Sequence, residues 1–250
     1  MEIATKCICC NSSSMKKHKA FLAPFMAYKA LGYHPSNSVI MSYVRAMWGK
    51  SLKCRECGVM FSDMRFNDEE MAKYYCNYMG DDYSELREHY EPFFKACRHK
   101  HATRLRPNLS DEEIFISRYI SPKRILDYGG GKGVNTPFSS TDAIIHIYDI
   151  GDKNCELLPD FGYDLITCCY VLEHVSYPQD ILNNIKKLMN ENTFLYVEVP
   201  HERIPYFLKW WWHEHINFFT PKGMENLIRN CGMTLVDSIT SPYYGFLVKR

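Results

Sequence analysis

The stretch RILDYGGGKG, residues 124–133, decides the fold. Its apolar start predicts a short buried strand that ends near Asp127 and runs directly into a turn. Gly129, Gly131 and Gly133 then occupy alternate positions, where glycine lets the backbone adopt unusual dihedral angles and approach a ligand closely. The stretch therefore predicts a strand whose end is shaped around a bound molecule.

Residues 144–149, 163–170 and 193–200 repeat this short apolar pattern and predict three more strands. Between the last two, residues 179–189 carry apolar side chains at helical spacing. Strand, helix and strand joined by short connections indicate right-handed crossovers and a parallel sheet. Two further strands close the chain after a helix over 219–231, so we expect an α/β fold with a Rossmann-like parallel sheet and an antiparallel C-terminal strand.

The glycines do not match the dinucleotide pattern G-x-G-x-x-G, because Val134 stands where the third glycine belongs. Asp149 follows the second strand, where a carboxylate can accept hydrogen bonds from ribose hydroxyls. Acidic residues disfavour a pyrophosphate. The pattern predicts a nucleoside site without phosphates, with plain turn chemistry as the alternative for the glycines.

Four cysteines form two Cys-x-x-Cys pairs, Cys7 with Cys10 and Cys54 with Cys57. Two such turns can complete a tetrahedron around Zn²⁺, and four thiolates leave no position open for catalysis. We expect a structural zinc site, although Cys9 could compete as a ligand and four unrelated buried thiols are the alternative. A redox pair is disfavoured because no thioredoxin-like unit surrounds either turn.

Composition limits the class of protein. The 250 residues are 46% hydrophobic with a net charge of +1, and they contain neither a long apolar run nor an ordinary secretory leader, so we expect a cytoplasmic protein without a membrane span. Residues 1–60 carry nine Lys or Arg against two acidic residues, yet the near-neutral whole gives no reason to expect tight nucleic-acid binding. Oligomeric state is left open.

A helical segment links the cysteine module to the sheet. Residues 68–106 predict two helices rich in aromatic side chains, and Ser110 with Glu113 predicts a capping box for a third helix that ends at Pro122. Pro137 is expected to shorten a helix after the glycines. We therefore predict a zinc-binding module over 1–66 and a second domain over 67–250, whose core starts near residue 110.

These motifs resemble those of class I S-adenosylmethionine-dependent methyltransferases over about residues 110–250. The resemblance rests on DYGGGKG at 127–133, Asp149, YDLITCCYVLEHV at 163–175 and LYVEVP at 195–200. It implies S-adenosylmethionine as cofactor, and it implies cofactor-binding roles for Asp127, Gly129, Gly131, Gly133, Asp149 and Tyr170.

The cysteine module together with HEHINFFTP at 213–221 is similar to the family of deoxysugar C-methyltransferases and its shorter relatives in surface-polysaccharide and natural-product gene sets. The resemblance implies that Glu214 and His215 lie in the substrate cleft. We predict His215 as the catalytic base, oriented by Glu214, with a packed wall residue as the alternative. The chain lacks that family's large C-terminal domain, and only fourteen residues separate Asp149 from Asp164, so no adenine-flanking acid is assigned beyond Asp152.

Three further residues are candidates for the same cleft. His174 follows the third strand and is expected near the transferred methyl group, unless it only begins a core helix. Trp212 could stack on a sugar ring or pack in the core. The resemblance alone implies that Tyr83 reaches the substrate.

We therefore expect methyl transfer to a small molecule, at a hydroxyl of a sugar, sugar nucleotide or related precursor, with O-methylation favoured over C-methylation. Nucleic-acid methylation or binding by the basic zinc module is one alternative. An inactive, zinc-stabilised scaffold is the other.

Overall fold

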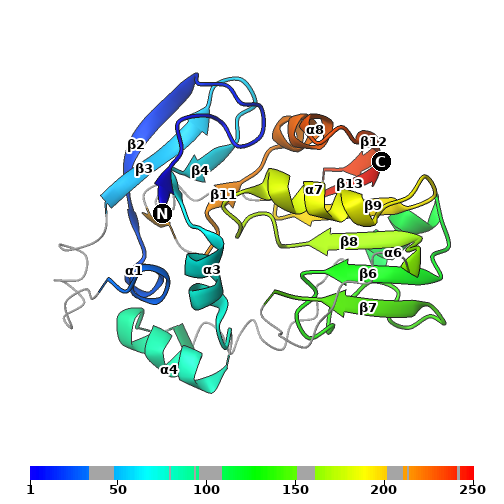
Figure 1. Ribbon diagram of the computed structural model, residues 1–250, viewed down its shortest axis with the longest axis horizontal. Coiled ribbons are helices and arrows are strands. Elements are labelled where there is room, and N and C mark those ends of the chain that lie inside the picture. The colour runs from blue at the N-terminus through cyan, green and yellow to red at the C-terminus, as the bar shows by residue number, and fades with distance from the viewer. Residues whose placement is uncertain are drawn as a thin grey trace.

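The computed structural model describes residues 1–33, 48–78, 80–92, 94–95, 109–150, 161–201, 211–212, 214–240 and 243–250. Two sheets lie beside one another in this part of the chain, with the helices α1, α3 and α4 close to the smaller sheet (Figure 1). No helix among the described residues is long and apolar enough to cross a membrane.

The larger sheet has six strands in the order β12, β13, β9, β8, β6, β7. Its parallel part consists of β7 (Ile144–Tyr148), β6 (Arg124–Tyr128), β8 (Leu165–Cys169) and β9 (Phe194–Val199). The last two strands, β13 (Tyr244–Lys249) and β12 (Thr234–Ile239), are antiparallel to their neighbours. The predicted Rossmann-like α/β fold is confirmed.

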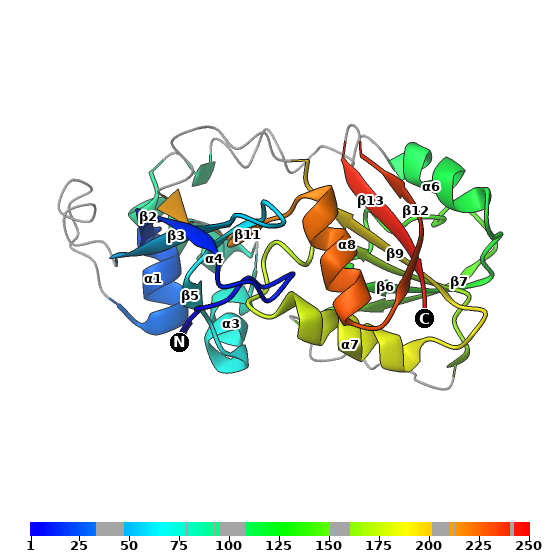
Figure 2. The same ribbon diagram turned by 90° about the horizontal axis from the view of Figure 1, so that it is seen from above.

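Helices cover both faces of this sheet, as Figure 2 shows from above. On one face α7 (Pro178–Leu188) and α8 (Pro221–Asn230) bury Leu182, Ile185 and Leu227 in the main core. On the other face α6 (Leu109–Ser117) packs Phe115 and Ile116 against the strands. Alternate residues of the central strands therefore enter two different cores, which is why these strands carry apolar side chains on both faces.

Two predicted helix features are wrong. Leu109 is already helical, so α6 does not begin after Ser110 as the capping box requires, and the Glu113 carboxylate accepts the backbone N–H of Phe138 at 2.6 Å. The helix ends at Ser117, before Pro122. No α-helix follows the glycines either: residues 129–143 connect β6 to β7 through turns, since the three left-handed glycines and Pro137 do not favour a continuous helix.

The smaller sheet has five strands in the order β10, β2, β3, β4, β11. Three come from the N-terminal region, β2 (Met15–Leu22), β3 (Trp48–Cys54) and β4 (Met60–Ser62), whereas β10 (Trp211–Trp212) and β11 (Asn217–Phe218) come from the C-terminal third. The chain thus returns to the N-terminal sheet immediately before and after Glu214 and His215. The boundary near residue 66 stays a prediction, since the N-terminal sheet also contains these later residues.

Three helices pack beside the smaller sheet: α1 (Pro24–Leu31), α3 (Asp68–Tyr75) and α4 (Asp81–Tyr90). Asn67 begins α3 with a complete capping box formed with Glu70. Phe25, Tyr74 and Tyr83 join Ile216 in a second core. The predicted aromatic helices are therefore present, although residues 93 and 96–104 of the second expected helix, predicted over 83–104, lie outside the described residues.

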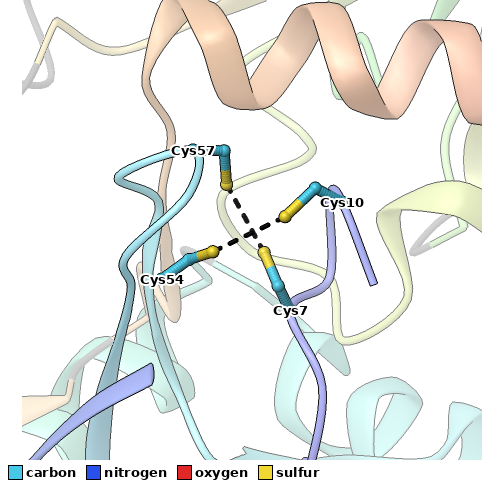
Figure 3. Close-up of side chains that lie close together, drawn as sticks. All are labelled: Cys7, Cys10, Cys54 and Cys57. Atoms are coloured by element: carbon cyan, nitrogen blue, oxygen red, sulfur yellow. Dashed lines mark hydrogen bonds between the residues drawn. The ribbon is translucent and has the colours of Figure 1, made fainter. Parts of the chain in front are cut away.

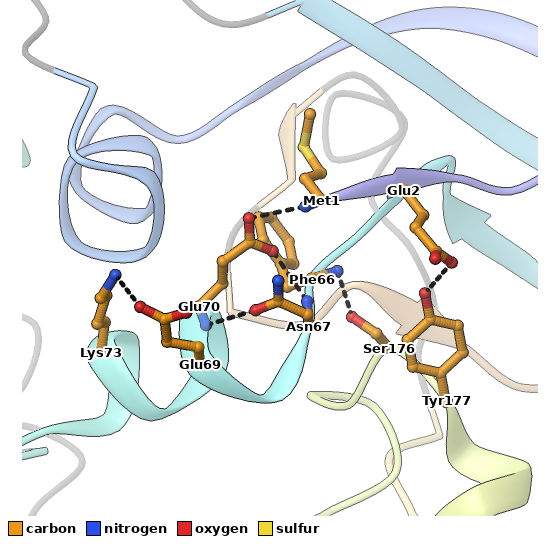
Figure 4. A network of polar contacts seen from close by, with 9 residues as sticks. All are labelled: Met1, Glu2, Phe66, Asn67, Glu69, Glu70, Lys73, Ser176 and Tyr177. Carbon is orange, nitrogen blue, oxygen red and sulfur yellow. Dashed lines mark hydrogen bonds and ion pairs between the residues drawn. The ribbon is translucent and has the colours of Figure 1, made fainter.

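A polar network joins the N-terminus to the start of α7 (Figure 4). The Met1 ammonium contacts Glu70 at 2.8 Å, and the Tyr177 hydroxyl donates to Glu2 at 2.6 Å. The backbone N–H of Phe66 donates to the Ser176 hydroxyl at 2.7 Å. These contacts attach the short strands β1 (Glu2–Ile3) and β5 (Met64–Arg65) to the start of α7, the helix between β8 and β9.

Candidate functional site

A pocket of about 210 Å³ lies at the carboxyl edge of the parallel strands. From β6 the chain moves to β7 on one side and returns to β8 on the other, and such a reversal opens a crevice where α/β proteins bind ligands. Residues from three strand ends and from α3 line the pocket. They include Gly129, Asp149, Tyr170, His174, Tyr75 and Tyr78.

The three alternating glycines all have left-handed backbone angles, with φ of +83°, +58° and +72° at Gly129, Gly131 and Gly133. A Cβ on Gly129 would lie 2.4 Å from Val171 Cγ2, and one on Gly133 would lie 2.3 Å from Ile147 Cδ1. Packing and conformation therefore both favour glycine at Gly129, whereas at Gly133 the end of the Ile147 side chain could shift and the left-handed backbone angle is the reason for glycine. Gly129 lines the pocket directly, and the other two shape the loop beside it.

Asp149 and Asp127, predicted together, take different places. Asp149 lines the pocket, and its Oδ2 accepts the Gly131 backbone N–H at 2.9 Å. Asp127 is buried and accepts hydrogen bonds from the hydroxyls of Thr136 at 2.5 Å and Thr167 at 2.9 Å. Asp127 thus fastens the glycine loop to β8, a contact that the sequence motif did not reveal, while Asp149 faces the ligand space.

Tyr170 follows β8 with a φ of +58°, an angle that bulky residues rarely adopt. Its backbone N–H donates to the carbonyl of Glu198 at 3.0 Å, and the residue lines the pocket. Backbone outliers of this kind cluster at functional sites because the surrounding structure must hold them. Tyr170 thus lies at the pocket with a strained backbone, and its cofactor contact stays a prediction.

The rings of His174 and His215 pack against one another although the two residues lie far apart in the sequence. Their ring centroids are 4.6 Å apart with the planes at 86°. Nδ1 of His174 lies 3.1 Å from the Glu214 carbonyl, which can only accept, so Nδ1 carries the proton and Nε2 is left with its lone pair. Burial, followed by the nearby His215, lowers the pKa of His174 to about 3.

The Glu214 carboxylate points toward the N-terminal helices. Its Oε2 accepts a hydrogen bond from the Tyr78 hydroxyl at 3.0 Å and another from Arg87 Nη1 at 3.2 Å. Tyr83 is buried and packs against the ring of Tyr78. Its hydroxyl contacts the Tyr74 hydroxyl and accepts a hydrogen bond from Arg87 Nη1. The structure therefore brings Tyr75 and Tyr78, rather than Tyr83, to the pocket lining. The sequence indicates these two tyrosines only as aromatic side chains of a predicted helical segment.

The side chains of two predicted site residues, one aromatic and one acidic, lie outside the described part of the structure. Trp212 pairs through its backbone with Leu22 of β2, but its side chain lies outside the described part of the structure. Asp152 also lies outside the described residues.

The four predicted metal-ligating cysteines converge from two separate turns (Figure 3). Cys7 and Cys57 have their sulfurs 3.5 Å apart, as do Cys10 and Cys54, and all four lie within 4.8 Å of one another. A tetrahedral ion with Zn–S bonds of about 2.3 Å holds its sulfurs about 3.8 Å apart, so this donor set fits Zn²⁺. Cys9 lies outside the cluster, and burial raises the pKa of its thiol well above the ordinary value.

One other group among the described residues brings ligand-type atoms together. Glu173, His174 and His215 offer such atoms within 4.8 Å of one another. Glu173 is almost fully buried, and its Oε1 lies 3.8 Å from Nε2 of His174. The group therefore places a buried carboxyl beside the two imidazoles.

The sheet order, the glycine loop and the acid at the neighbouring strand end define a Rossmann-like protein with a nucleoside-type pocket. A family model described as a methyltransferase domain matches residues 98–238, more than half of the chain. The chain belongs to this methyltransferase domain family, and the expected class of protein is thereby confirmed.

Individual relatives are distant. The ubiquinone biosynthesis O-methyltransferase of Acinetobacter baumannii is 28% identical over 101 residues, which are 35% of this chain and 42% of that protein. The chain thus matches less than half the length of these curated relatives.

Among solved structures, the 1,6-didemethyltoxoflavin-N1-methyltransferase of Burkholderia thailandensis aligns with a TM-score of 0.51 and 16% identity, covering 78% of this chain and 96% of that one. A SAM-dependent methyltransferase from Aquifex aeolicus, also 16% identical, gives a TM-score of 0.45 over 62% of this chain and 98% of that one.

Proposed function

We propose that the protein transfers a methyl group from S-adenosylmethionine to a hydroxyl of a small molecule of the sugar or sugar-nucleotide type. One observation carries the proposal: a single pocket joins the glycine loop and Asp149 to His174. A nucleoside cofactor would therefore lie beside the His174–His215 pair, of which His174 lines the pocket and His215 packs against it. This supports group transfer rather than a purely structural role for the fold.

The described lining suits a sulfonium nucleoside. It contains Asp149 and several tyrosines but no Lys or Arg, so within the described residues nothing there would neutralise a pyrophosphate. Gly129 would lie against the cofactor through bare backbone, Asp149 would accept the ribose hydroxyls and Tyr170 would flank it. When bound, the sulfonium supplies the activated methyl group.

The acceptor hydroxyl must lose its proton when its oxygen takes the methyl group. His174, with a pKa of about 3, stays neutral near pH 7 and is a weak proton acceptor. We therefore assign proton removal to His215, with His174 as the neutral partner that packs edge-on against it. Glu214 would position both imidazoles through its backbone, since its carbonyl meets His174 and the next residue is His215.

Aromatic side chains support a ring-shaped acceptor. Tyr75 and Tyr78 line the pocket on the side of α3, and flat tyrosine faces with hydroxyls at their edges suit the C–H faces and hydroxyls of a sugar. The substrate contacts that the sequence predicts for Trp212 and Tyr83 are likewise proposals. O-methylation over C-methylation and a role in surface-polysaccharide or natural-product synthesis are likewise proposed.

Cys7, Cys10, Cys54 and Cys57 would hold a structural Zn²⁺. Their thiolates would complete the coordination shell, and the ion would supply cross-linking of the two turns rather than chemistry. The ion would thereby stabilise the N-terminal sheet to which β11 belongs.

Methyl-transfer assays test the proposed function directly. The protein would be incubated with labelled S-adenosylmethionine and a panel of sugars, sugar nucleotides, phenols and RNA, and products would be identified by mass spectrometry. We expect a methylated sugar-type product that wild-type protein forms and His215→Ala does not. Methyl label found only on phenols would show that the acceptor is a phenol and not a sugar. The absence of label on every compound would support an inactive scaffold.

A second candidate, nucleic-acid binding, has one observation in its favour. Lys16 lies directly opposite Lys53 on β2 and β3, and Lys19 lies opposite Lys50, all four exposed. Like charges at opposed positions destabilise a sheet, so an anionic partner would relieve them. A steep loss of RNA affinity with rising salt would favour this function.

A further inference from the structure

Arg87 connects the N-terminal helices to the candidate catalytic segment. We propose that Arg87 is a positioning residue for methyl transfer, which holds Glu214 so that the His174 and His215 imidazoles keep their relative orientation. The inference rests on the proposed function for the role of the two histidines. The contacts that carry it are independent of which acceptor is methylated.

The guanidinium is held firmly on α4. Its side chain is 3% exposed, and Nε donates to Glu91 Oε2 at 2.8 Å one helical turn away. The Phe94 ring lies 4.0 Å from the guanidinium carbon, close enough for a cation–π contact. Because Glu91 and Phe94 fix one side of the guanidinium, its Nη1 is presented to Glu214 in a defined direction.

Nη1 makes the long-range contact. It donates to Glu214 Oε2 at 3.2 Å, across 127 positions of sequence, and the Tyr78 hydroxyl donates to the same oxygen at 3.0 Å. Tyr78 itself lines the pocket. The Glu214 carboxylate is therefore held by two donors, Arg87 on α4 and Tyr78 in the turn that follows α3 and lines the pocket.

The clamp continues to the histidines through the backbone. The Glu214 carbonyl accepts the Nδ1 proton of His174 at 3.1 Å, which leaves Nε2 of His174 unprotonated. His215 is the next residue along the chain, and its ring packs edge-on against that of His174. A displacement of Glu214 would therefore remove the acceptor that keeps the proton on His174 Nδ1, and it would also shift His215. Arg87 touches neither imidazole ring in the contacts described above.

A buried arginine needs a carboxylate partner for stability alone, and Glu91 already supplies one. The contact to Glu214 is additional, and it reaches the one segment that carries His215. A purely structural arginine would not alter the protonation site on His174, so this property separates the two roles.

The experiment measures the His174 tautomer by long-range ¹H–¹⁵N NMR on ¹⁵N-histidine-labelled full-length protein, with His174→Asn used for assignment. Wild type is compared with Arg87→Met and with Arg87→Lys, which keeps the buried charge. Lys73→Met, which removes an exposed contact to Glu69 on neighbouring α3, is the matched control. Labelled S-adenosylhomocysteine measures cofactor binding, and kcat is measured on whichever acceptor the panel identifies.

We expect one tautomer, protonated at Nδ1, in wild type and in Lys73→Met, and a mixture in Arg87→Met with cofactor affinity within twofold of wild type. Loss of this positioning is expected to lower kcat about 10²-fold, with a smaller loss in Arg87→Lys. Should Arg87→Met fail to fold, Arg87→Lys decides: a wild-type tautomer and wild-type kcat in that variant overturn the proposal. Failure of the proposed function would appear differently, as no methyl transfer by wild type, and the tautomer would still report whether Arg87 controls Glu214.

Discussion

The hydroxyl of Thr220 donates a 2.6 Å hydrogen bond to the backbone carbonyl of Cys57. Thr220 also begins α8 by accepting the Gly223 backbone N–H at 3.0 Å. The Thr220 side chain thus connects the Cys54–Cys57 turn of the candidate zinc site to the first turn of α8, which packs on the larger sheet. Since His215 lies five residues before Thr220, the cysteine cluster and the candidate catalytic segment share one support.

Removing a cysteine ligand tests this support. We expect Cys54→Ser to lose bound zinc, measured by elemental analysis, and to lower the Tm by about 6–12 °C, which corresponds to about 3 kcal/mol for a chain of this size. Cys76→Ser is the control, because Cys76 is an exposed thiol outside the cluster. Equal metal content and equal Tm in the two variants would show that the four cysteines hold no structural ion.

Thr220→Val should destabilise the junction without removing a ligand. Loss of the helix cap and of the Cys57 contact is expected to cost about 1–2 kcal/mol in the free energy of unfolding. Denaturant unfolding of the zinc-loaded protein measures it. Unchanged stability would mean that α8 does not depend on this contact.

The glycine loop offers a matched pair of substitutions. Both Gly129→Ala and Gly131→Ala force alanine into the left-handed region at about 1–2 kcal/mol each. Gly129→Ala also drives its Cβ to 2.4 Å from Val171, whereas the nearest atom to a Cβ on Gly131 is Asp149 Oδ2 at 3.9 Å. We therefore expect a clearly greater loss of stability and of S-adenosylhomocysteine affinity in Gly129→Ala; equal losses would contradict the described packing.

His215→Ala should separate chemistry from binding. We expect its turnover to fall by about 10²–10⁴-fold, the usual contribution of a general base, while S-adenosylhomocysteine binds as in wild type. Single-turnover methyl transfer and calorimetry measure the two quantities. Full turnover in this variant would leave His215 as a packed wall residue.

His174 predicts how stability depends on pH. Its folded pKa of about 3 lies below the ordinary value of 6.5, so below about pH 6 the unfolded chain binds a proton that the folded protein excludes. Above about pH 6.5 this group is neutral in both states and does not alter the stability, and below that pH it destabilises the folded protein by about 1.4 kcal/mol per pH unit as the pH drops toward 3. We expect His174→Asn to lose stability less steeply than wild type between pH 6 and 4 in denaturant titrations; parallel curves would contradict the shifted pKa.

Local patterns predicted much of the larger sheet, because each strand there carries its own signal. Residues 124–128 were expected as a strand and form β6, since an apolar run ending in glycines leaves little alternative. The return of β10 and β11 to the N-terminal sheet was not predicted, because strands of two residues have no periodicity to detect.

The candidate site was predictable where its residues belong to motifs and unpredictable where they meet only in space. Gly129, Asp149 and His174 reach one pocket as the strand ends implied. No spacing along the chain indicates the hydrogen bonds of Thr136 and Thr167 to Asp127. The same holds for the hydrogen bond of Arg87 to Glu214, which joins distant segments.

Calorimetry with S-adenosylhomocysteine tests the central claim most directly, namely that the pocket at the carboxyl edge of β6, β7 and β8 receives a sulfonium nucleoside. We expect saturable one-to-one binding to wild type, and at least about tenfold weaker binding to Asp149→Ala, which loses hydrogen bonds from an ionised acceptor worth about 1.5–3 kcal/mol. Absence of binding to the zinc-loaded wild type, or equal affinity in Asp149→Ala, would contradict the account.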